Sequence, residues 1–307
     1  MSLRIAILGG TSHIARALTH CFLQKETELT LFARSPEKLP SLPCRIIKGF
    51  ESFPSGEFDL VINCIGAGTP KELKDDYNRW FSVLEKFDNL ALDYLKNINP
   101  QTLYVMFSSG AVYGRQSGKP ATEDSSWNFF PNRLSVPDYY AISKIYSEAK
   151  HRSLPQLRIA DLRIFSFFSR YIDLDSGYFM TDLVRSLVQK RVFETAPGDM
   201  FRDFPHPEDL AELILNCAAV PQINTAIDVA SKSPVSKQEI LKLYTEHFGL
   251  HYQFSSLQAT HSPNGNVNIY LPTGTMAEKS LNWQARYTSI ETLISETEII
   301  LKHYGKA

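Results

Sequence analysis

The sequence predicts an α/β protein with a doubly wound parallel sheet and a smaller C-terminal lobe. Over the first 165 residues, short apolar runs alternate with segments of helical periodicity. The runs are apolar throughout, which is typical of parallel strands that helices cover on both faces. With 307 residues, 43% of them hydrophobic, the chain is large enough for such a core and an additional lobe.

The first expected element is a strand at Leu3–Leu8, which ends at Gly9-Gly10 and is followed by a helical pattern from His13 to Lys25. The same alternation then continues, with apolar runs as strands and longer helical patterns between them. The further expected strands are Glu28–Ala33, Arg45–Lys48, Phe58–Ile65, Leu103–Ser108 and Arg158–Phe165, and the helices are Glu72–Asn97 and Asp138–Ser153.

The alternation of apolar runs and helical patterns stops at Ser166, where aromatic and polar residues mix and glycines and prolines become frequent. A helix at Asp209–Ala219 and a strand at Ala226–Val229 then indicate a return to the main sheet. We therefore expect a dinucleotide-binding domain at 1–165 with a return segment at about 206–230. Residues 166–205 and 231–307 are expected to form a substrate-binding lobe.

Composition and charge favour a small-molecule partner. The 32 basic and 33 acidic residues are interspersed and give a net charge of -1, which offers no footprint for nucleic acid or an anionic membrane. The four cysteines are widely spaced, so neither a disulfide framework nor a metal site is indicated. The N-terminus lacks the pattern of a signal peptide and no apolar run reaches membrane-spanning length, so we expect a cytoplasmic protein.

The turn after the first strand is the expected phosphate-binding site. In doubly wound sheets, free backbone amides and the positive end of the first helix face a bound pyrophosphate. The residues expected to contact the cofactor here are Gly9, Thr11, Ser12, His13 and Ile14.

The second strand ends in Arg34-Ser35, about where an acidic residue would bind the adenosine ribose of NAD. Arg34 with Ser35 is suited to a 2′-phosphate and favours NADP(H). A solvated arginine is the alternative, and NAD(H) stays open. After the fourth strand, the small-residue loop expected to pass under the adenosine side of the cofactor contains Cys64, Ile65 and Gly66.

Tyr140 and Lys144 are the candidate catalytic pair. Four residues apart on a helix, they lie on one face, about 6 Å apart along the axis. A phenol with an ordinary pKa of about 10 needs a nearby cation to act as an acid or base near neutrality. Lys144 is also placed to bind the nicotinamide ribose. The alternative is a surface Tyr and Lys on an amphipathic helix.

The third catalytic candidate is Ser109, in the segment Leu103–Gly114, LYVMFSSGAVYG. With the Tyr-Lys pair, this segment resembles the SSxxVYG motif of the extended short-chain dehydrogenases/reductases, a Rossmann-fold family of nucleotide-sugar epimerases, dehydratases and reductases. The resemblance implies that Ser109 contacts the reacting oxygen. The first turn is similar to the family's GxxGxxG, with Gly9 retained and Ser12 and Ala15 in the other glycine positions.

Two downstream segments extend the resemblance. Residues 162–166, LRIFS, are similar to the family's LRxFN, which places Phe165 at the cofactor and Ser166 where an asparagine commonly contacts substrate. Residues 201–209 resemble RDFVHVDD, whose arginine binds the diphosphate of a nucleotide sugar, a role that falls to Arg202. A structural ion pair of Arg202 with Asp203 or Glu208 is the alternative.

The two residues after Ser109 help to distinguish which reaction a member of the family catalyses. Dehydratases carry an Asp-Glu pair there, and some epimerases an additional Cys, whereas this chain has Gly110 and Ala111. Reduction of a keto group on a nucleotide-linked deoxysugar by NADPH is therefore the first hypothesis. An NAD-dependent nucleotide-sugar epimerase and a catalytically silent NADP(H)-binding sensor are the alternatives. The resemblance also implies a homodimer.

Overall fold

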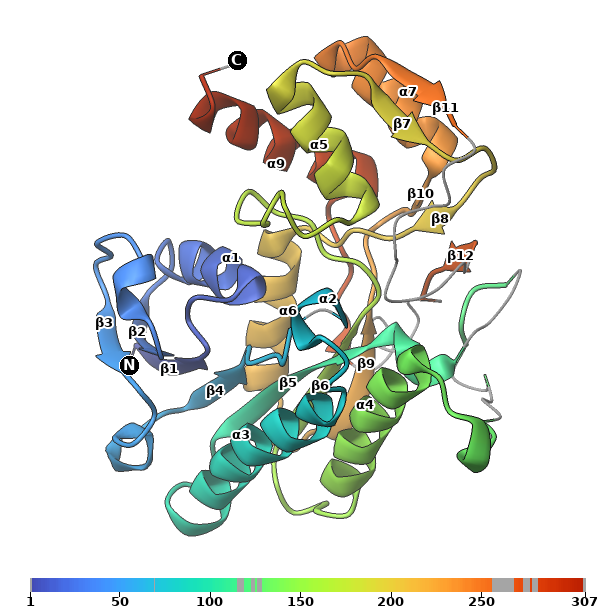
Figure 1. Cartoon of the computed structure of the whole chain (residues 1–307). Helices are drawn as coiled ribbons and strands as arrows, with labels where there is room; N and C mark the ends of the chain where they lie inside the picture. The colour runs from blue at the N-terminus through green and yellow to red at the C-terminus, as the bar shows by residue number, and fades with distance from the viewer. Residues whose placement is uncertain are drawn as a thin grey trace.

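The computed structural model describes residues 2–68, 70–114, 119–122, 125, 129–255, 268–272, 277 and 281–305. Its centre is a seven-stranded sheet of order β3-β2-β1-β4-β5-β6-β9 in which all neighbouring strands are parallel (Figure 1). The strands are β1 (Leu3–Leu8), β2 (Thr27–Ala33), β3 (Arg45–Lys48), β4 (Leu60–Asn63), β5 (Leu103–Ser109), β6 (Ile159–Ile164) and β9 (Asn224–Val229). The order reverses at β1, and the crevice beyond the carboxyl ends of β1 and β4 is where such sheets bind ligands.

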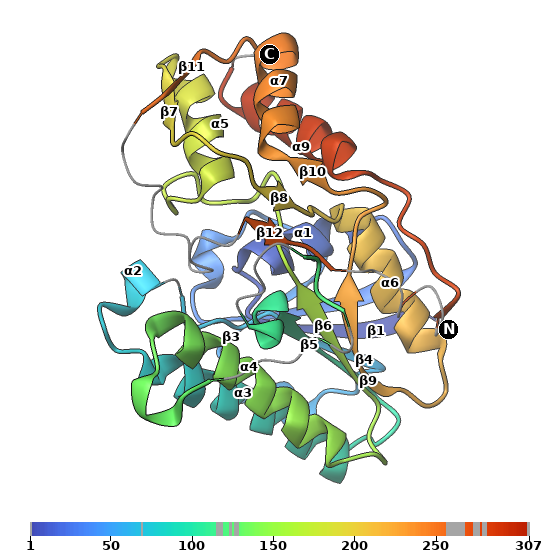
Figure 2. The same ribbon diagram turned by 90° about the vertical axis from the view of Figure 1, so that its right-hand side faces the viewer.

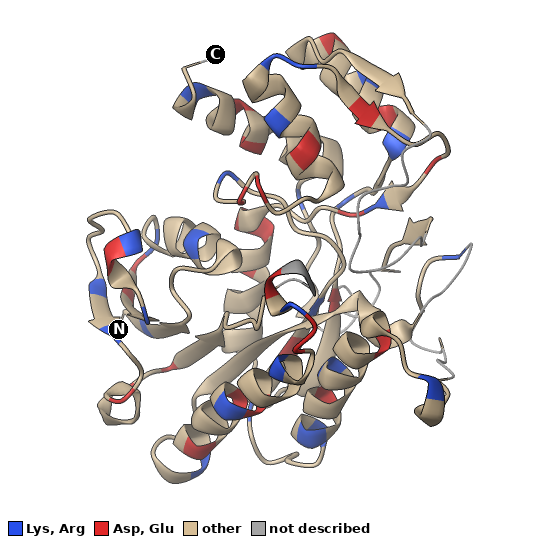
Figure 3. Ribbon diagram, in the orientation of Figure 1, with Lys and Arg blue, Asp and Glu red and all other residues tan. Residues whose placement is uncertain are grey.

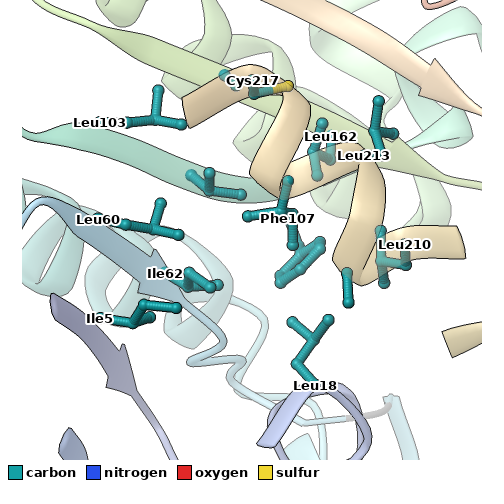
Figure 4. Packing of buried hydrophobic residues seen from close by; sticks show 14 of the residues in the cluster. Ile5, Leu18, Leu60, Ile62, Leu103, Phe107, Leu162, Leu210, Leu213 and Cys217 are labelled. Carbon is teal, nitrogen blue, oxygen red and sulfur yellow. The ribbon is translucent and has the colours of Figure 1, made fainter. Parts of the chain in front are cut away.

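Helices cover both faces of the sheet, as the continuous apolar strands require. The helices α1 (His13–Phe22) and α6 (Pro207–Ala219) pack together on one face, and α3 (Asn78–Asn97) and α4 (Val136–Arg152) pack together on the other (Figure 2). Leu18 of α1 and Leu210 of α6 meet Ile62 of β4 and Phe107 of β5 in a fully apolar layer (Figure 4). The sheet is therefore buried on both sides, as predicted.

The expected helix Glu72–Asn97 is wrong in one respect, because it is two helices. A short α2 (Pro70–Leu73) ends at Lys74 and Asp75, whose φ angles of 48° and 70° lie in the left-handed region. Residues other than glycine rarely adopt these φ angles, and here they turn the chain before α3 begins. The periodic apolar pattern runs through this break and conceals it.

The lobe has a core of its own, in which Phe168, Leu183, Ile240, Tyr244 and Leu293 are buried. It lies above the carboxyl edge of the main sheet (Figure 1). Its elements are α5 (Phe179–Gln189), β7 (Phe193–Thr195), β8 (Phe201–Arg202), β10 (Val235–Ser236), α7 (Lys237–Phe248), β11 (Tyr252–Phe254), β12 (Ile269–Tyr270) and α9 (Ser289–His303). β8 lies between β10 and β12, and β7 pairs with β11.

The C-terminal segment is shared between the two cores. Trp283, from the range expected to belong to the lobe, packs with Ala277 against the α1 and α6 layer of the main sheet. Short 3₁₀ turns among the described residues lie at Pro36–Lys38, Phe53–Ser55, Gly110–Tyr113 and Pro131–Arg133.

Charged residues of both signs are distributed over the helices (Figure 3). Within the described ranges, no helix is long and apolar enough to cross a membrane.

Candidate active site

The glycine turn after β1 is closely packed against two neighbouring strands. Gly9 has a φ of +82°, and a Cβ there would lie 2.8 Å from the Cγ1 atom of Ile65. The N–H groups of Gly9 and Gly10 both donate to the Phe32 carbonyl at the end of β2, at 2.9 and 3.0 Å. Glycine is required at position 9 because both the backbone angle and the contact exclude a side chain.

The start of α1 presents free amides. Ser12 is its N-cap, and the Ser12 Oγ accepts the N–H of Ala15 at 3.3 Å. Within the part of the chain that the structure describes, the N–H groups of Thr11, His13 and Ile14 have no acceptor. These three donors at a positive helix end fit a pyrophosphate, and Ser12 keeps its hydroxyl hydrogen to donate.

The His13 ring is turned away from this helix end. Its Nε2 lies 2.8 Å from the Ser169 Oγ, and the ring packs on Phe167 with centroids 5.1 Å apart. Burial, with the nearby Arg16 charge, lowers the pKa of His13 to about 4. The imidazole is therefore neutral at physiological pH and braces the loop after β6, so only the His13 backbone N–H faces a bound phosphate.

The residues expected on the adenosine side of the cofactor are exposed or have free space around them. Arg34 is exposed directly after β2, and no hydrogen bond or ion pair holds its guanidinium among the described residues. Ser35 follows as the N-cap of the next 3₁₀ turn without a side-chain capping bond. Across the crevice, the Cys64 N–H donates to Leu8, and nothing lies within 4 Å of where a Gly66 Cβ would be.

Ser109, Tyr140 and Lys144 occupy one corner of the sheet edge. Ser109 is the last residue of β5, and α4 packs against the 3₁₀ turn that follows it. The Lys144 Nζ donates to the Phe107 carbonyl of β5 at 2.7 Å and lies 5.8 Å from the centre of the Tyr140 ring. Tyr140 and Lys144 thus sit on the sheet-facing side of α4 instead of forming a solvated surface pair.

Three aromatic residues that are not among the candidates from the sequence lie near Ser109, Tyr140 and Lys144. Trp80 packs edge-on against Tyr140 at 5.4 Å between centroids. The pKa of Tyr178 is raised to about 12, chiefly by the loss of solvent around its hydroxyl and less by the Tyr140 phenol. The Tyr270 hydroxyl of β12 lies 3.1 Å from the Ser109 Oγ. These residues come from distant parts of the chain, so no local spacing could have identified them.

Phe165 packs against Gly110, the residue that follows the candidate catalytic Ser109. It is buried, and its ring would lie 2.4 Å from a Cβ at Gly110. A carboxylate at position 110 would therefore overlap this ring. Ser166 follows with a half-buried side chain, for which no hydrogen bond is found in the described ranges.

Arg202 of β8 lies beside Tyr270 of β12 in register, with its guanidinium 6.0 Å from the centre of the Tyr270 ring. Its Nη1 donates to the carbonyls of Phe201 and Asn268. Asp203 instead accepts the Ser231 N–H at 2.8 Å, and Glu208 lies 3.5 Å from Arg286. The two carboxylates expected as alternative partners of Arg202 are thus engaged with other groups.

Comparison with known proteins identifies the family. The model of the NAD dependent epimerase/dehydratase family matches residues 5–228. The chain belongs to this family. The match confirms the resemblance to extended short-chain dehydrogenases/reductases and makes the chain a member of a family of enzymes. No curated protein matches the sequence significantly.

Solved structures similar to this epimerase/dehydratase family member share its fold over nearly the whole chain. UDP-glucose 4-epimerase from Bifidobacterium longum, in complex with NAD+ and UDP, is 17% identical, with 99% of each chain covered and a TM-score of 0.77. UDP-glucuronic acid 4-epimerase from Bacillus cereus is 16% identical, with 98% of this chain and 100% of that chain covered and a TM-score of 0.78. dTDP-glucose 4,6-dehydratase from Bacillus anthracis is 15% identical, with 98% and 97% covered and a TM-score of 0.76.

Proposed function

We propose that this epimerase/dehydratase family member reduces a keto group on a nucleotide-linked deoxysugar, with NADPH as the reductant. The observation that carries the proposal is the gathering of Ser109, Tyr140 and Lys144 at the carboxyl end of β5. This corner belongs to the same sheet edge as the glycine turn after β1. A hydride donor held by the turn would therefore reach the corner where the proton donor lies.

The nicotinamide dinucleotide, when bound, supplies the hydride. Its pyrophosphate would be held by the N–H groups of Thr11, His13 and Ile14, and its adenosine would lie over the loop from Cys64 to Gly66. Arg34 and Ser35 supply a cation and a hydroxyl where the 2′-phosphate of NADP(H) would lie. Lys144, on the inner side of α4, would hold the nicotinamide ribose.

The protein side chains handle the proton and the developing negative charge. Tyr140 donates its phenolic proton to the substrate oxygen, and the Lys144 ammonium stabilises the phenolate that remains. Ser109 donates a hydrogen bond to the same oxygen as negative charge develops on it. Arg202 would bind the diphosphate, because a guanidinium fork matches two phosphate oxygens.

The crowded position 110 supports reduction over dehydration. Elimination of water needs an additional acid and base beside the serine, and the Phe165 ring occupies the space that a side chain at Gly110 would need. Ala111 also carries no ionisable group. Hydride transfer with a single proton donor is the chemistry that this corner supports.

A nucleotide-sugar epimerase is the second candidate. It is favoured by the solved structures of similar fold, several of which are 4-epimerases in complex with NAD. An epimerase would use the same three side chains and would keep its oxidised cofactor through each turnover, whereas a reductase must exchange it.

A substrate panel with two variants tests the proposal. Purified protein is mixed with NADPH or NADH and with uridine- or thymidine-linked 4-keto-6-deoxyhexoses, and loss of cofactor absorbance is followed. We expect stoichiometric consumption of NADPH. Tyr140→Phe should lower kcat by about 10²-fold or more through loss of the acid. Tyr139→Phe, which alters the neighbouring phenol stacked on Tyr77, is the matched control and should retain activity.

Two results would contradict the reductase. Interconversion of two nucleotide sugars without added reductant, by protein that retains its dinucleotide through gel filtration, would establish the epimerase. NADPH binding without turnover of any substrate, equally in wild type and Tyr140→Phe, would favour the silent sensor.

A further inference from the structure

We propose that Tyr270 is a positioning residue for Ser109: by donating its hydroxyl hydrogen to the serine oxygen, it leaves Ser109 able to act only as a donor toward the reacting oxygen of the substrate. The inference rests on the proposed function and adds to it a residue from the opposite lobe.

The hydrogen-bonding capacity of a serine hydroxyl carries the argument. A hydroxyl has one hydrogen to donate and two lone pairs with which to accept. The Ser109 Oγ accepts the Ala111 N–H at 3.2 Å and lies 3.1 Å from the Tyr270 hydroxyl. If Tyr270 is the donor, both lone pairs are occupied and only the Ser109 hydrogen remains. Ser109 then cannot accept a further hydrogen bond and can only donate one to the substrate oxygen, which stabilises negative charge there.

The Tyr270 hydroxyl is held in place from both sides. Its ring is buried, packs on Phe165 with centroids 5.0 Å apart, and belongs to a small cluster with Tyr113 and Ala121. Its strand β12 pairs with β8 in the lobe, while the next residue, Leu271, accepts the Ala121 N–H at 3.0 Å. Contacts from the lobe strand β8 and from Ala121 thus hold the strand that carries Tyr270.

The environment keeps Tyr270 protonated, so its hydroxyl hydrogen is available to donate. Burial raises the pKa of Tyr270 well above its usual range; the Ser109 hydrogen bond opposes this rise, whereas the neighbouring Tyr140 phenol adds to it. Tyr270 therefore stays a neutral phenol across physiological pH. Neither Tyr270 nor Ser109 loses a proton in the reaction: the proton that completes the alcohol comes from Tyr140.

A double-mutant cycle on the reduction reaction tests the inference. Tyr270→Phe removes one oxygen and keeps the ring packed on Phe165. We expect kcat to fall about tenfold, the effect of one lost hydrogen bond, with KM for NADPH and for the nucleotide sugar unchanged. In the Ser109→Ala background the same substitution should change kcat by less than about twofold, because the serine that it positions is gone.

Tyr244→Phe is the matched control, since it removes another buried phenol hydroxyl, which bonds to Thr297 in the lobe core away from the site. It should leave kcat unchanged. If Tyr270→Phe unfolds, an isosteric fluorinated tyrosine at position 270 replaces it. That more acidic phenol should ionise at lower pH, and kcat should then decline with rising pH where the wild type does not.

The outcomes distinguish a failure of the positioning role of Tyr270 from a failure of the proposed reductase function. An active wild type whose kcat is unaltered by Tyr270→Phe, or a full tenfold loss that persists in the Ser109→Ala background, overturns the positioning role and leaves the reductase intact. A rise in KM for the sugar at constant kcat overturns it too, because Tyr270 would then only bind substrate. A wild type that reduces no member of the panel overturns the proposed function and the inference with it.

Discussion

Arg34 lies exposed just beyond β2, two residues after the Phe32 carbonyl that anchors the glycine turn. A guanidinium in this place can pair with a 2′-phosphate but gives no comparable contact to the ribose hydroxyls of NAD. The preference between the two dinucleotides is therefore expected to reside in one side chain.

Replacing Arg34 by Ala should raise KM for NADPH about tenfold and leave KM for NADH within about twofold, because only the 2′-phosphate loses its partner. Steady-state kinetics with both cofactors measures this. Arg45→Ala is the control, since Arg45 is also exposed but begins β3 beside Thr30 in the middle of β2, whereas Arg34 follows the carboxyl end of β2. An equal rise in KM for NADPH and NADH would show that Arg34 does not bind the 2′-phosphate.

Gly9→Ala should destabilise the fold and weaken dinucleotide binding together. The left-handed backbone and the contact with Ile65 both oppose a Cβ. Gly177→Ala isolates the backbone contribution, because Gly177 has a φ of +76° and nothing within 4 Å. Urea unfolding should show Gly9→Ala less stable than Gly177→Ala by about 2 kcal/mol. Equal stabilities would mean that the turn relaxes to admit a side chain.

Between elements, a buried polar network joins α3, α4 and three strands below the cofactor loop. His151 of α4 contacts Asp88 of α3 and Asp161 of β6 at 2.7 and 2.8 Å, and all three side chains are fully buried. Tyr104 donates to Asp88 and accepts from Asn63, whose Oδ1 accepts the Ile65 N–H. The network thus extends from the middle of the protein to the loop that is proposed to face the dinucleotide.

This network predicts a pH-dependent stability. Burial disfavours the charged imidazole, but the hydrogen bonds and charges of Asp161 and Asp88 outweigh it and raise the pKa of His151 to about 9. Because the folded pKa exceeds the unfolded one, the stabilisation is complete below about pH 6.5 and is lost as pH rises through about 9.

We expect the free energy of unfolding of the wild type to fall by up to about 3 kcal/mol more than that of His151→Gln between those pH values. Urea denaturation at several pH values gives both curves. Groups that do not contact His151 or its two carboxylate partners contribute equally to both curves and cancel in the difference. Parallel curves would show that His151 is already neutral in the fold.

The elements show which features local sequence can reveal. The strands were predictable because each is a continuous apolar run, and Tyr140 with Lys144 because four residues make one helical turn. The break at Lys74 and Asp75 was not, because left-handed residues leave the apolar pattern intact. Asp88 and His151 were not singled out either, since charged residues on a helix ordinarily face solvent.

At the scale of the whole molecule, the site is assembled from two lobes. Ser109 ends a strand of the main sheet, and its partner Tyr270 lies 161 residues later in the lobe. The buried Glu296 of α9 holds Arg170, in the segment that follows β6, through a bond of 2.7 Å to its Nη2. Contacts of this range depend on the folded arrangement, so sequence spacing indicated Ser109, Tyr140 and Lys144 as candidates but not the residues around them.

We propose that hydride passes from an exchangeable dinucleotide to a sugar carbon beside Ser109, Tyr140 and Lys144. The most direct test uses NADPH carrying deuterium at the transferable position, with a nucleotide-linked keto-deoxysugar as substrate and mass spectrometry of the product. We expect one deuterium at the new carbinol carbon for each NADPH consumed, and almost none with Tyr140→Phe in the same time. A product without deuterium, formed while the NADPH remains unconsumed, would contradict it.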